Sequence, residues 1–280
     1  WSPSSGLSSS TAANPTANPS STTTYTVTKT TTANGCTDTD AVEVTVNTTA
    51  PTAGITNNTG STVLTCATTS ISVTATGGSS YSWDNSLGSN AAATISGANT
   101  YTVTATAANG CTDTESVTVT TNTTAPTAAA GSDFTKTCSS NSSGAAIGES
   151  AASGYTYSWS PSSGLSSSTA ANPTANPSST TTYTVTKTTT ANGCTDTDAV
   201  DVTVNTTAPT AGITNNTGST ELTCATTSIS VTATGGDSYS WDNSLGSNAA
   251  ATISGANTYT VTATAANGCT DTESITVTSN

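Results

Sequence analysis

Seven cysteines give this chain of 280 residues its clearest capacity for chemistry, and they occur in two settings. One group follows an Asn-Gly pair, and the other precedes a predicted strand. The first group comprises Cys36, Cys111, Cys194 and Cys269, and the second comprises Cys66, Cys138 and Cys224. Recurrent cysteines in a chain without His indicate disulfides in an oxidising, extracellular setting. A zinc site would require closer spacings such as C-x2-C, which the sequence lacks.

Acidic residues follow each Asn-Gly-Cys motif on the next predicted strand. They are Asp38, Asp40 and Glu43; Asp113 and Glu115; Asp196, Asp198 and Asp201; and Asp271 and Glu273. Carboxylates clustered at a domain junction can bind Ca²⁺, so the candidate calcium ligands are Asp113, Glu115, Asp196, Asp198, Asp271 and Glu273. A solvated strand end that resists pairing with other chains explains the same pattern. Because no EF-hand or RTX-type spacing is present, we favour the strand end and expect no other cofactor.

Catalysis is not expected. Without His, the chain cannot form Ser-His or Cys-His nucleophile pairs. Ser-Lys chemistry would need Lys29, Lys136 or Lys187, and the first and last occupy equivalent positions in repeat copies, which favours a scaffold. The net charge of −13 predicts repulsion from nucleic acid and anionic lipid. No apolar run approaches the roughly 20 residues of a membrane span.

A repeated hairpin must position these residues. In the stretch from Asn99 to Thr121, Tyr101, Val103 and Ala105 alternate with threonines, which is typical of a strand with one buried face. Asn and Gly then form a tight turn, and a second alternating run follows. Further copies span residues 23–47, 181–205 and 258–278.

The repeat continues over the whole chain. Residues 1–122 recur as 159–280 with five differences, and linkers of sequence N-T-T-A-P-T lie at 47–52, 122–127 and 205–210. We therefore predict a partial module at 1–49 that lacks its N-terminal half, short modules at 50–124 and 208–280, and a long module at 125–207. The odd cysteine, Cys36, would then have its partner outside this fragment of a longer protein.

Each full module is predicted to be all-β, with about seven short strands, in a tandem, extended array of immunoglobulin-like β-sandwiches. A tryptophan in mid-module and a tyrosine opening the penultimate strand are assigned to the core. These residues are Trp1, Trp83, Trp159 and Trp241 with Tyr101, Tyr183 and Tyr259.

The patterns Y-S-W-S-P-S-S-G-L-S, T-T-T-Y-T-V-T and N-G-C-T-D-T-D-A-V-D-V-T-V resemble the tandem Ig-like (PKD-like) repeats of Bacteroidota surface proteins. That group includes gliding-motility adhesins and cell-surface filaments. The resemblance implies export to the bacterial cell surface, often by the type IX route.

Two disulfide arrangements stay open. Pairing within modules gives Cys66–Cys111, Cys138–Cys194 and Cys224–Cys269. However, the first cysteine of a module is expected roughly 30 Å from the turn cysteine, at the opposite end of the sandwich. Bridged Cα atoms lie about 5–6 Å apart. Pairing across modules gives Cys66–Cys194 and Cys138–Cys269 and would stiffen the array.

The function that we expect is a structural stalk or filament segment of a large surface adhesin, with the other modules of the chain as partners. Lateral or filament self-association stays open. The alternatives are carbohydrate- or surface-binding modules, which would use exposed Tyr and Trp, and ice binding by Thr arrays. Strand twist disfavours the flat surface that ice binding requires.

Overall fold

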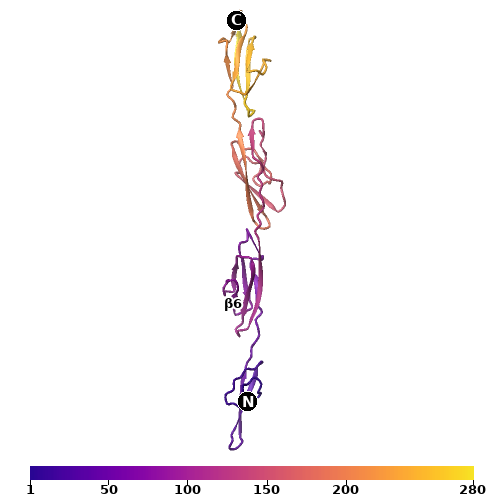
Figure 1. The fold of residues 1–280 in the computed structure, drawn as a ribbon, viewed down its shortest axis with the longest axis vertical. Coiled ribbons are helices and arrows are strands. Elements are labelled where there is room, and N and C mark those ends of the chain that lie inside the picture. Colours follow the sequence, from indigo (N-terminus) through magenta and orange to yellow (C-terminus); the bar gives the residue numbers. More distant parts are fainter. The chain divides into compact units, whose positions relative to one another are not determined.

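A computed structural model describes residues 1–280, and every regular element in it is a β-strand. The chain divides into two compact units, residues 1–123 and 124–280, which are described here separately. Figure 1 draws the strands, coloured along the sequence. No helix of the length and apolarity needed to cross a membrane is present. The strands form the sheets of tandem Ig-like sandwich modules, so the chain is an all-β protein.

The short module of the first unit has seven strands in two sheets. They are β3 (Gly54–Asn57), β4 (Val63–Thr65), β5 (Ile71–Thr76), β6 (Ser80–Trp83), β7 (Ala92–Ile95), β8 (Asn99–Thr106) and β9 (Thr112–Asn122). One sheet has the order β3-β5-β7, and the other has the order β4-β9-β8-β6. All pairs are antiparallel except β4 with β9. This division of seven strands over two sheets is the immunoglobulin-like arrangement that the sequence predicts.

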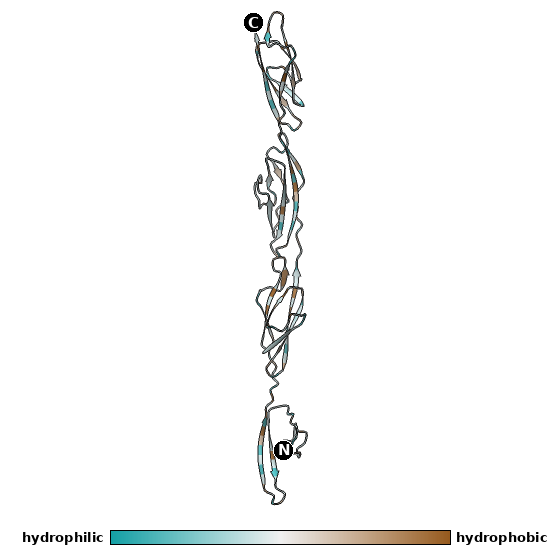
Figure 2. Ribbon diagram, turned by 90° about the vertical axis from the view of Figure 1, so that its left-hand side faces the viewer, coloured by the Kyte–Doolittle hydropathy of each residue, from teal (hydrophilic) through white to brown (hydrophobic).

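The core of this module lies between the two sheets. In β8 every second residue is buried, because Tyr101, Val103 and Ala105 share one face, and threonines occupy the other. Figure 2 shows apolar bands, in brown, interspersed with pale and hydrophilic stretches along the strands. Trp83 is 5% exposed, and its indole Nε1 donates a hydrogen bond to the carbonyl of Asn90 at 3.0 Å.

The second short module repeats this fold within the second unit. Its strands are β16 (Gly212–Asn215), β17 (Glu221–Leu222), β18 (Ile229–Thr234), β19 (Ser238–Trp241), β20 (Ala250–Ile253), β21 (Asn257–Thr264) and β22 (Thr270–Ser279). The sheet orders are β16-β18-β20 and β17-β22-β21-β19. Trp241 and Tyr259 are buried as their counterparts are.

The long module has one complete sheet and one that is reduced to two short strands. Its strands are β10 (Phe134–Thr137), β11 (Ala145–Ala146), β12 (Tyr155–Ser160), β13 (Thr174–Ala175), β14 (Thr181–Thr189) and β15 (Thr195–Asn205). The sheet orders are β10-β15-β14-β12 and β11-β13. Trp159 and Tyr183 lie in the core with Ile147, Val185 and Val200.

The partial module contains one hairpin, β1 (Thr23–Thr30) with β2 (Thr37–Val44). Val42 is 51% exposed, whereas its repeat copy in the long module, Val200, is 1% exposed. The assignment of Trp1 to a closed core is wrong for this module, because its side chain is only partly buried. In the long module, residues 125–158 supply the strands and loops that complete the core around Trp159.

Candidate functional site: the module junction and the strand-end carboxylates

A disulfide joins the long module to the short module that follows it. Cys138 and Cys269 are bonded, with Cα atoms 5.0 Å apart and 131 positions between them in the sequence. This is the cross-module arrangement. The prediction of pairing within modules is wrong. Because Cys138 and Cys269 are bonded to each other, neither Cys138–Cys194 nor Cys224–Cys269 is formed. Because Cys111 is free, Cys66–Cys111 is not formed either.

The physical reason is the position of each cysteine on its sandwich. Cys138 follows β10, and Cys194 follows the turn between β14 and β15, where β15 begins. Since β10 runs parallel to the last part of β15, with Thr137 opposite Asn205, the two cysteines lie at opposite ends of the same sheet. Cys138 is thereby presented toward the next module.

Hydrogen bonds from the turn of the next module close the same junction. The side-chain amide of Asn267 donates to the Oδ1 of Asn205 at 3.0 Å and to the carbonyl of Thr207 at 2.9 Å. The Oδ1 of Asn267 also accepts from the backbone N–H of Cys269 at 3.0 Å. One asparagine thus fixes the cysteine within its turn and fixes the turn to the linker.

A glycine allows the two modules to approach closely. Gly268 has a φ of +78°, and a Cβ atom built on it would lie 2.4 Å from the Cβ of Ser139. Ser139 in turn donates a hydrogen bond from its hydroxyl to the carbonyl of Asn267 at 3.3 Å. The Asn-Gly-Cys sequence therefore has three separate roles at the junction: linker recognition, clearance and the covalent bond.

Asparagines of other Asn-Gly-Cys turns also donate hydrogen bonds to a linker. Asn109 donates to the Oδ1 of Asn47 at 3.0 Å and to the carbonyl of Thr49 at 3.0 Å, and Asn192 donates to the carbonyl of Thr124 at 2.9 Å. The free cysteines are Cys36, Cys111 and Cys224. The pairing of Cys66 with Cys194 stays a prediction.

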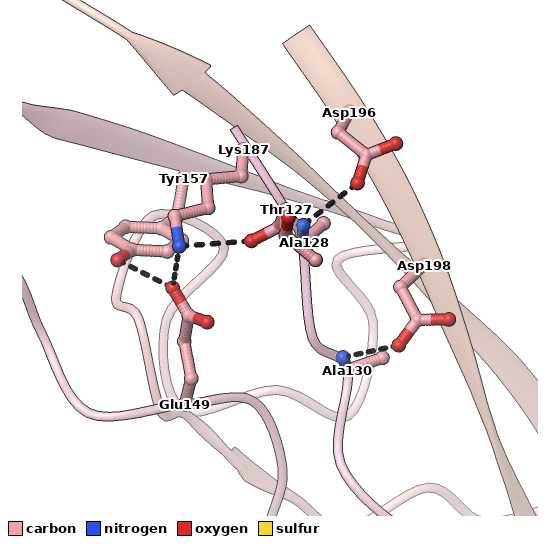
Figure 3. A network of polar contacts seen from close by, with 8 residues as sticks. All are labelled: Thr127, Ala128, Ala130, Glu149, Tyr157, Lys187, Asp196 and Asp198. Carbon is pink, nitrogen blue, oxygen red and sulfur yellow. Dashed lines mark hydrogen bonds and ion pairs between the residues drawn. The ribbon is translucent and has the colours of Figure 1, made fainter. Parts of the chain in front are cut away.

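The acidic residues after the cysteines hold the first segment of each module. Asp113 accepts from the backbone N–H of Ala53 at 2.9 Å, and Asp271 accepts from that of Ala211 at 2.9 Å. In the long module, Asp196 accepts from Ala128 at 2.8 Å, and Asp198 accepts from Ala130 at 2.8 Å (Figure 3). These carboxylates replace the missing strand partners of an edge segment. The sequence did not predict this role.

The candidate calcium ligands are not gathered into one site. Glu115 and Glu273 are exposed on β9 and β22, whereas Asp113 and Asp271 point an oxygen at a backbone amide. The structure contains no group of three or more carboxylate or cysteine side chains placed to hold a metal ion.

A buried lysine network is confined to the long module. The Nζ of Lys187 lies 2.5 Å from Glu149 Oε1 and donates to the carbonyl of Thr127 at 3.0 Å (Figure 3). The hydroxyl of Tyr157 donates to the same glutamate oxygen at 2.9 Å. The only sequence signal was an apolar-face position of β14 occupied by Lys, where the short modules have Ala105 and Ala263.

The network shifts the pKa of both charged groups. The hydrogen bond from Lys187 holds the pKa of Glu149 below its ordinary value of 4.5, although burial opposes this shift. The hydrogen bond to Glu149 raises the pKa of Lys187 above its ordinary value of 10.5, again against burial. Lys187 also lies 4.5 Å from the ring centroid of Tyr155. Both groups are therefore charged over the physiological pH range, and their arrangement is that of a structural ion pair.

Comparison with known proteins finds solved structures with a low level of similarity and no matching family. No protein family and no curated relative matches the sequence. Similar solved structures include the N-terminal eight Ig domains of Down Syndrome Cell Adhesion Molecule, with 11% identity, 91% of this chain and 40% of that chain covered, and a TM-score of 0.34. An I-band fragment of titin is 13% identical, and the match covers 78% of this chain and 94% of that fragment with a TM-score of 0.34. The human desmocollin-1 ectodomain is 11% identical, and the match covers 89% of this chain and 62% of that ectodomain with a TM-score of 0.26. The chain spans well under half of the first of these structures.

Proposed function

We propose that this chain is a non-catalytic stalk segment of a large bacterial cell-surface adhesin or filament, in which disulfides carry tension from one module to the next. The single observation that supports this function is the Cys138–Cys269 bridge between two consecutive modules. A bridge inside a module would protect that module alone. A bridge across a junction instead joins neighbours, so the partners of each module are the other modules of the chain.

The position of the bridge determines which residues bear load. When the ends of the second unit are pulled apart, tension passes from residue 138 to residue 269 through the sulfur atoms. The intervening segment, which contains the core strands β12, β14 and β21, is then outside the covalent path of the force. The disulfide therefore limits how far the chain can extend even after both modules unfold.

Extracellular localisation is part of the proposal, because a disulfide persists in an oxidising compartment. The buried positions of Trp83, Trp159 and Trp241 support a mechanical function over carbohydrate binding by the same indoles. Each of these indoles makes a hydrogen bond to a backbone carbonyl of its own module.

Single-molecule stretching of the full chain tests this function. The variant to be stretched has Ser in place of Cys36, Cys66, Cys111, Cys194 and Cys224, so that only the Cys138–Cys269 bridge can form. The bridge removes 131 residues from the extensible length. At up to 3.6 Å per extended residue, reductant should lengthen the fully unfolded chain by about 460 Å.

The matched control adds Cys138→Ser and Cys269→Ser, and its length should not respond to reductant. Equal lengths of the first protein with and without reductant would show that the bridge bears no load, and the mechanical function would then be abandoned.

A further inference from the structure

The turn that carries Cys269 is held to the preceding linker by the side chain of Asn267. Its amide donates to the carbonyl and the Oδ1 of Asn205 at 3.3 and 3.0 Å and to the carbonyl of Thr207 at 2.9 Å. We call these three hydrogen bonds the linker contact. Because Asn205 is the last residue of β15, the linker contact fixes the turn of the short module to the end of a strand of the long module.

The strand pairing of the long module places Cys138 beside the residue that the linker contact holds. β10 pairs in parallel with β15, and Thr137, the last residue of β10, lies opposite Asn205. Cys138 is the next residue along the chain, and Cys269 follows Asn267 by two positions. A turn that is fixed to Asn205 therefore carries Cys269 to Cys138.

The same contact forms at a turn whose cysteine is not in a disulfide. In the first unit, Asn109 donates to the carbonyl and the Oδ1 of Asn47 at 3.2 and 3.0 Å and to the carbonyl of Thr49 at 3.0 Å. Its Oδ1 accepts from the N–H of Cys111 at 3.0 Å, and the thiol of Cys111 is free. The linker contact is thus a property of the turn and the linker, and it does not depend on a covalent bond.

We propose that Asn267 is a positioning residue for disulfide formation: its linker contact forms before the Cys138–Cys269 bond, holds the two thiols together and thereby selects Cys138 as the partner of Cys269. This deepens the proposed function, on which it rests for the use of the bridge. The close approach of Gly268 to Ser139 and the hydrogen bond from the Ser139 hydroxyl to the carbonyl of Asn267 at 3.3 Å complete the contact around the sulfur atoms. Docking of this kind gives the two thiols a high effective concentration relative to each other.

The exposure of the two cysteines assigns the order of the covalent step. Cys138 is exposed and Cys269 is 3% exposed, so a small-molecule disulfide such as glutathione disulfide reacts first at Cys138. The Cys138 thiolate attacks one sulfur of glutathione disulfide, which forms a mixed disulfide and releases one glutathione thiolate. The Cys269 thiolate then attacks the Cys138 sulfur and releases the second glutathione thiolate. Two protein thiols are oxidised, one glutathione disulfide is reduced, and the two thiol protons pass through solvent to the released glutathiones.

The experiment measures the effective concentration of the two thiols in the full chain that keeps only Cys138 and Cys269. This chain is equilibrated at a series of ratios of reduced to oxidised glutathione, quenched with acid, and the bridged fraction is measured by mass spectrometry. Asn267→Asp keeps the oxygen that accepts from the N–H of Cys269 but removes the donor to the linker. The effective concentration should fall about tenfold, as expected from the loss of one or two net hydrogen bonds.

Two further variants control for a general loss of structure. Asn109→Asp makes the same change at the turn of the first unit and should leave the effective concentration unchanged. Asn205→Ala removes one acceptor from the other side of the linker contact and should lower the effective concentration about fivefold. It replaces Asn267→Asp as the test if circular dichroism of the reduced chain shows that Asn267→Asp does not fold. An unchanged value in the folded Asn267→Asp chain, an unchanged value in Asn205→Ala, or an equal loss in Asn109→Asp would each overturn the proposal.

The order of events is tested in a chain with Ser in place of all seven cysteines. The side-chain amide protons of Asn267 should exchange slowly with solvent in this chain, because the linker contact forms without the disulfide. Exchange as fast as in the urea-unfolded chain would show that the contact requires the bond, and the proposal would be abandoned.

The selection of Cys138 is tested with all cysteines present. After refolding of the wild-type chain with glutathione disulfide, peptide mapping should find Cys269 linked to Cys138, whereas Asn267→Asp should divert part of Cys269 to other cysteines. Exclusive Cys138–Cys269 linkage in the variant would contradict the selecting role. None of these measurements reports on the load that the completed bridge carries, so a failure here is distinguishable from a failure of the mechanical function.

Discussion

The ammonium group of Lys187 lies 2.5 Å from the carboxylate of Glu149, and their side chains are only 10% and 23% exposed. Lys29 occupies the equivalent position of the partial module and is exposed. The same strand sequence, T-T-T-Y-T-V-T-K-T, thus places one lysine in a closed network and the other in solvent. This difference provides an internal control for the contribution of the network.

Replacing Lys187 with Ala should destabilise the long module by about 2 kcal/mol, because Glu149 loses its partner in a largely desolvated position. Hydrogen exchange of peptides from residues 125–207 should accelerate correspondingly. Lys29→Ala is the matched control and should leave exchange unchanged throughout the chain. Equal effects of the two substitutions would show that the network contributes nothing beyond the lysine side chain itself.

The pH dependence of the long module should follow the lowered pKa of Glu149. A carboxyl group whose pKa is lower in the folded state stabilises the fold above its unfolded pKa. That contribution is lost as the pH falls through the folded value. Urea unfolding of the wild type and of Glu149→Gln should therefore differ most near neutral pH, and the difference should shrink below about pH 4. A difference that stays constant down to acid pH would contradict the assignment.

The strand-end carboxylates should protect from hydrogen exchange the backbone amides that donate to them. Asp196→Ala removes the acceptor for Ala128, and Asp198→Ala removes that for Ala130. Each should cost about 1.5–3 kcal/mol of local stability, which is the range for a hydrogen bond to a charged group. Amide exchange at residues 127–131 is the measurement. The control is Asp38→Ala, because Asp38 accepts only from the adjacent Thr39 in its own strand. Unchanged exchange protection in the Asp196→Ala variant would refute the stabilising role of this hydrogen bond.

Calcium should have little effect on stability if these carboxylates serve as backbone clamps. We expect the melting profile to be the same in EDTA and in millimolar Ca²⁺, because Asp113 and Asp271 already use an oxygen to hold a backbone amide. A rise in melting temperature that Glu115→Gln or Glu273→Gln removes would instead establish the calcium site considered from the sequence.

The sequence by itself determined the strands and the seven-strand sandwich of the short modules. Alternation of Tyr101, Val103 and Ala105 with threonines fixes both the strand and its buried face, because side chains of a strand alternate between its two sides. The Asn-Gly pair fixes the turn, since it supplies residues that tolerate positive φ. These are local properties, so they can be read from neighbouring residues.

Only the tertiary structure decided between the two pairings of Cys138 and revealed the partners of Lys187 and Asp196. Each of these interactions joins residues that are distant in the sequence, such as Cys138 and Cys269 at a separation of 131. A sequence pattern specifies which face of its own strand a residue occupies. Which remote segment lies against that face depends on how the sheets and modules pack, and this packing selects one cysteine, one carboxylate and one amide from many chemically equivalent ones.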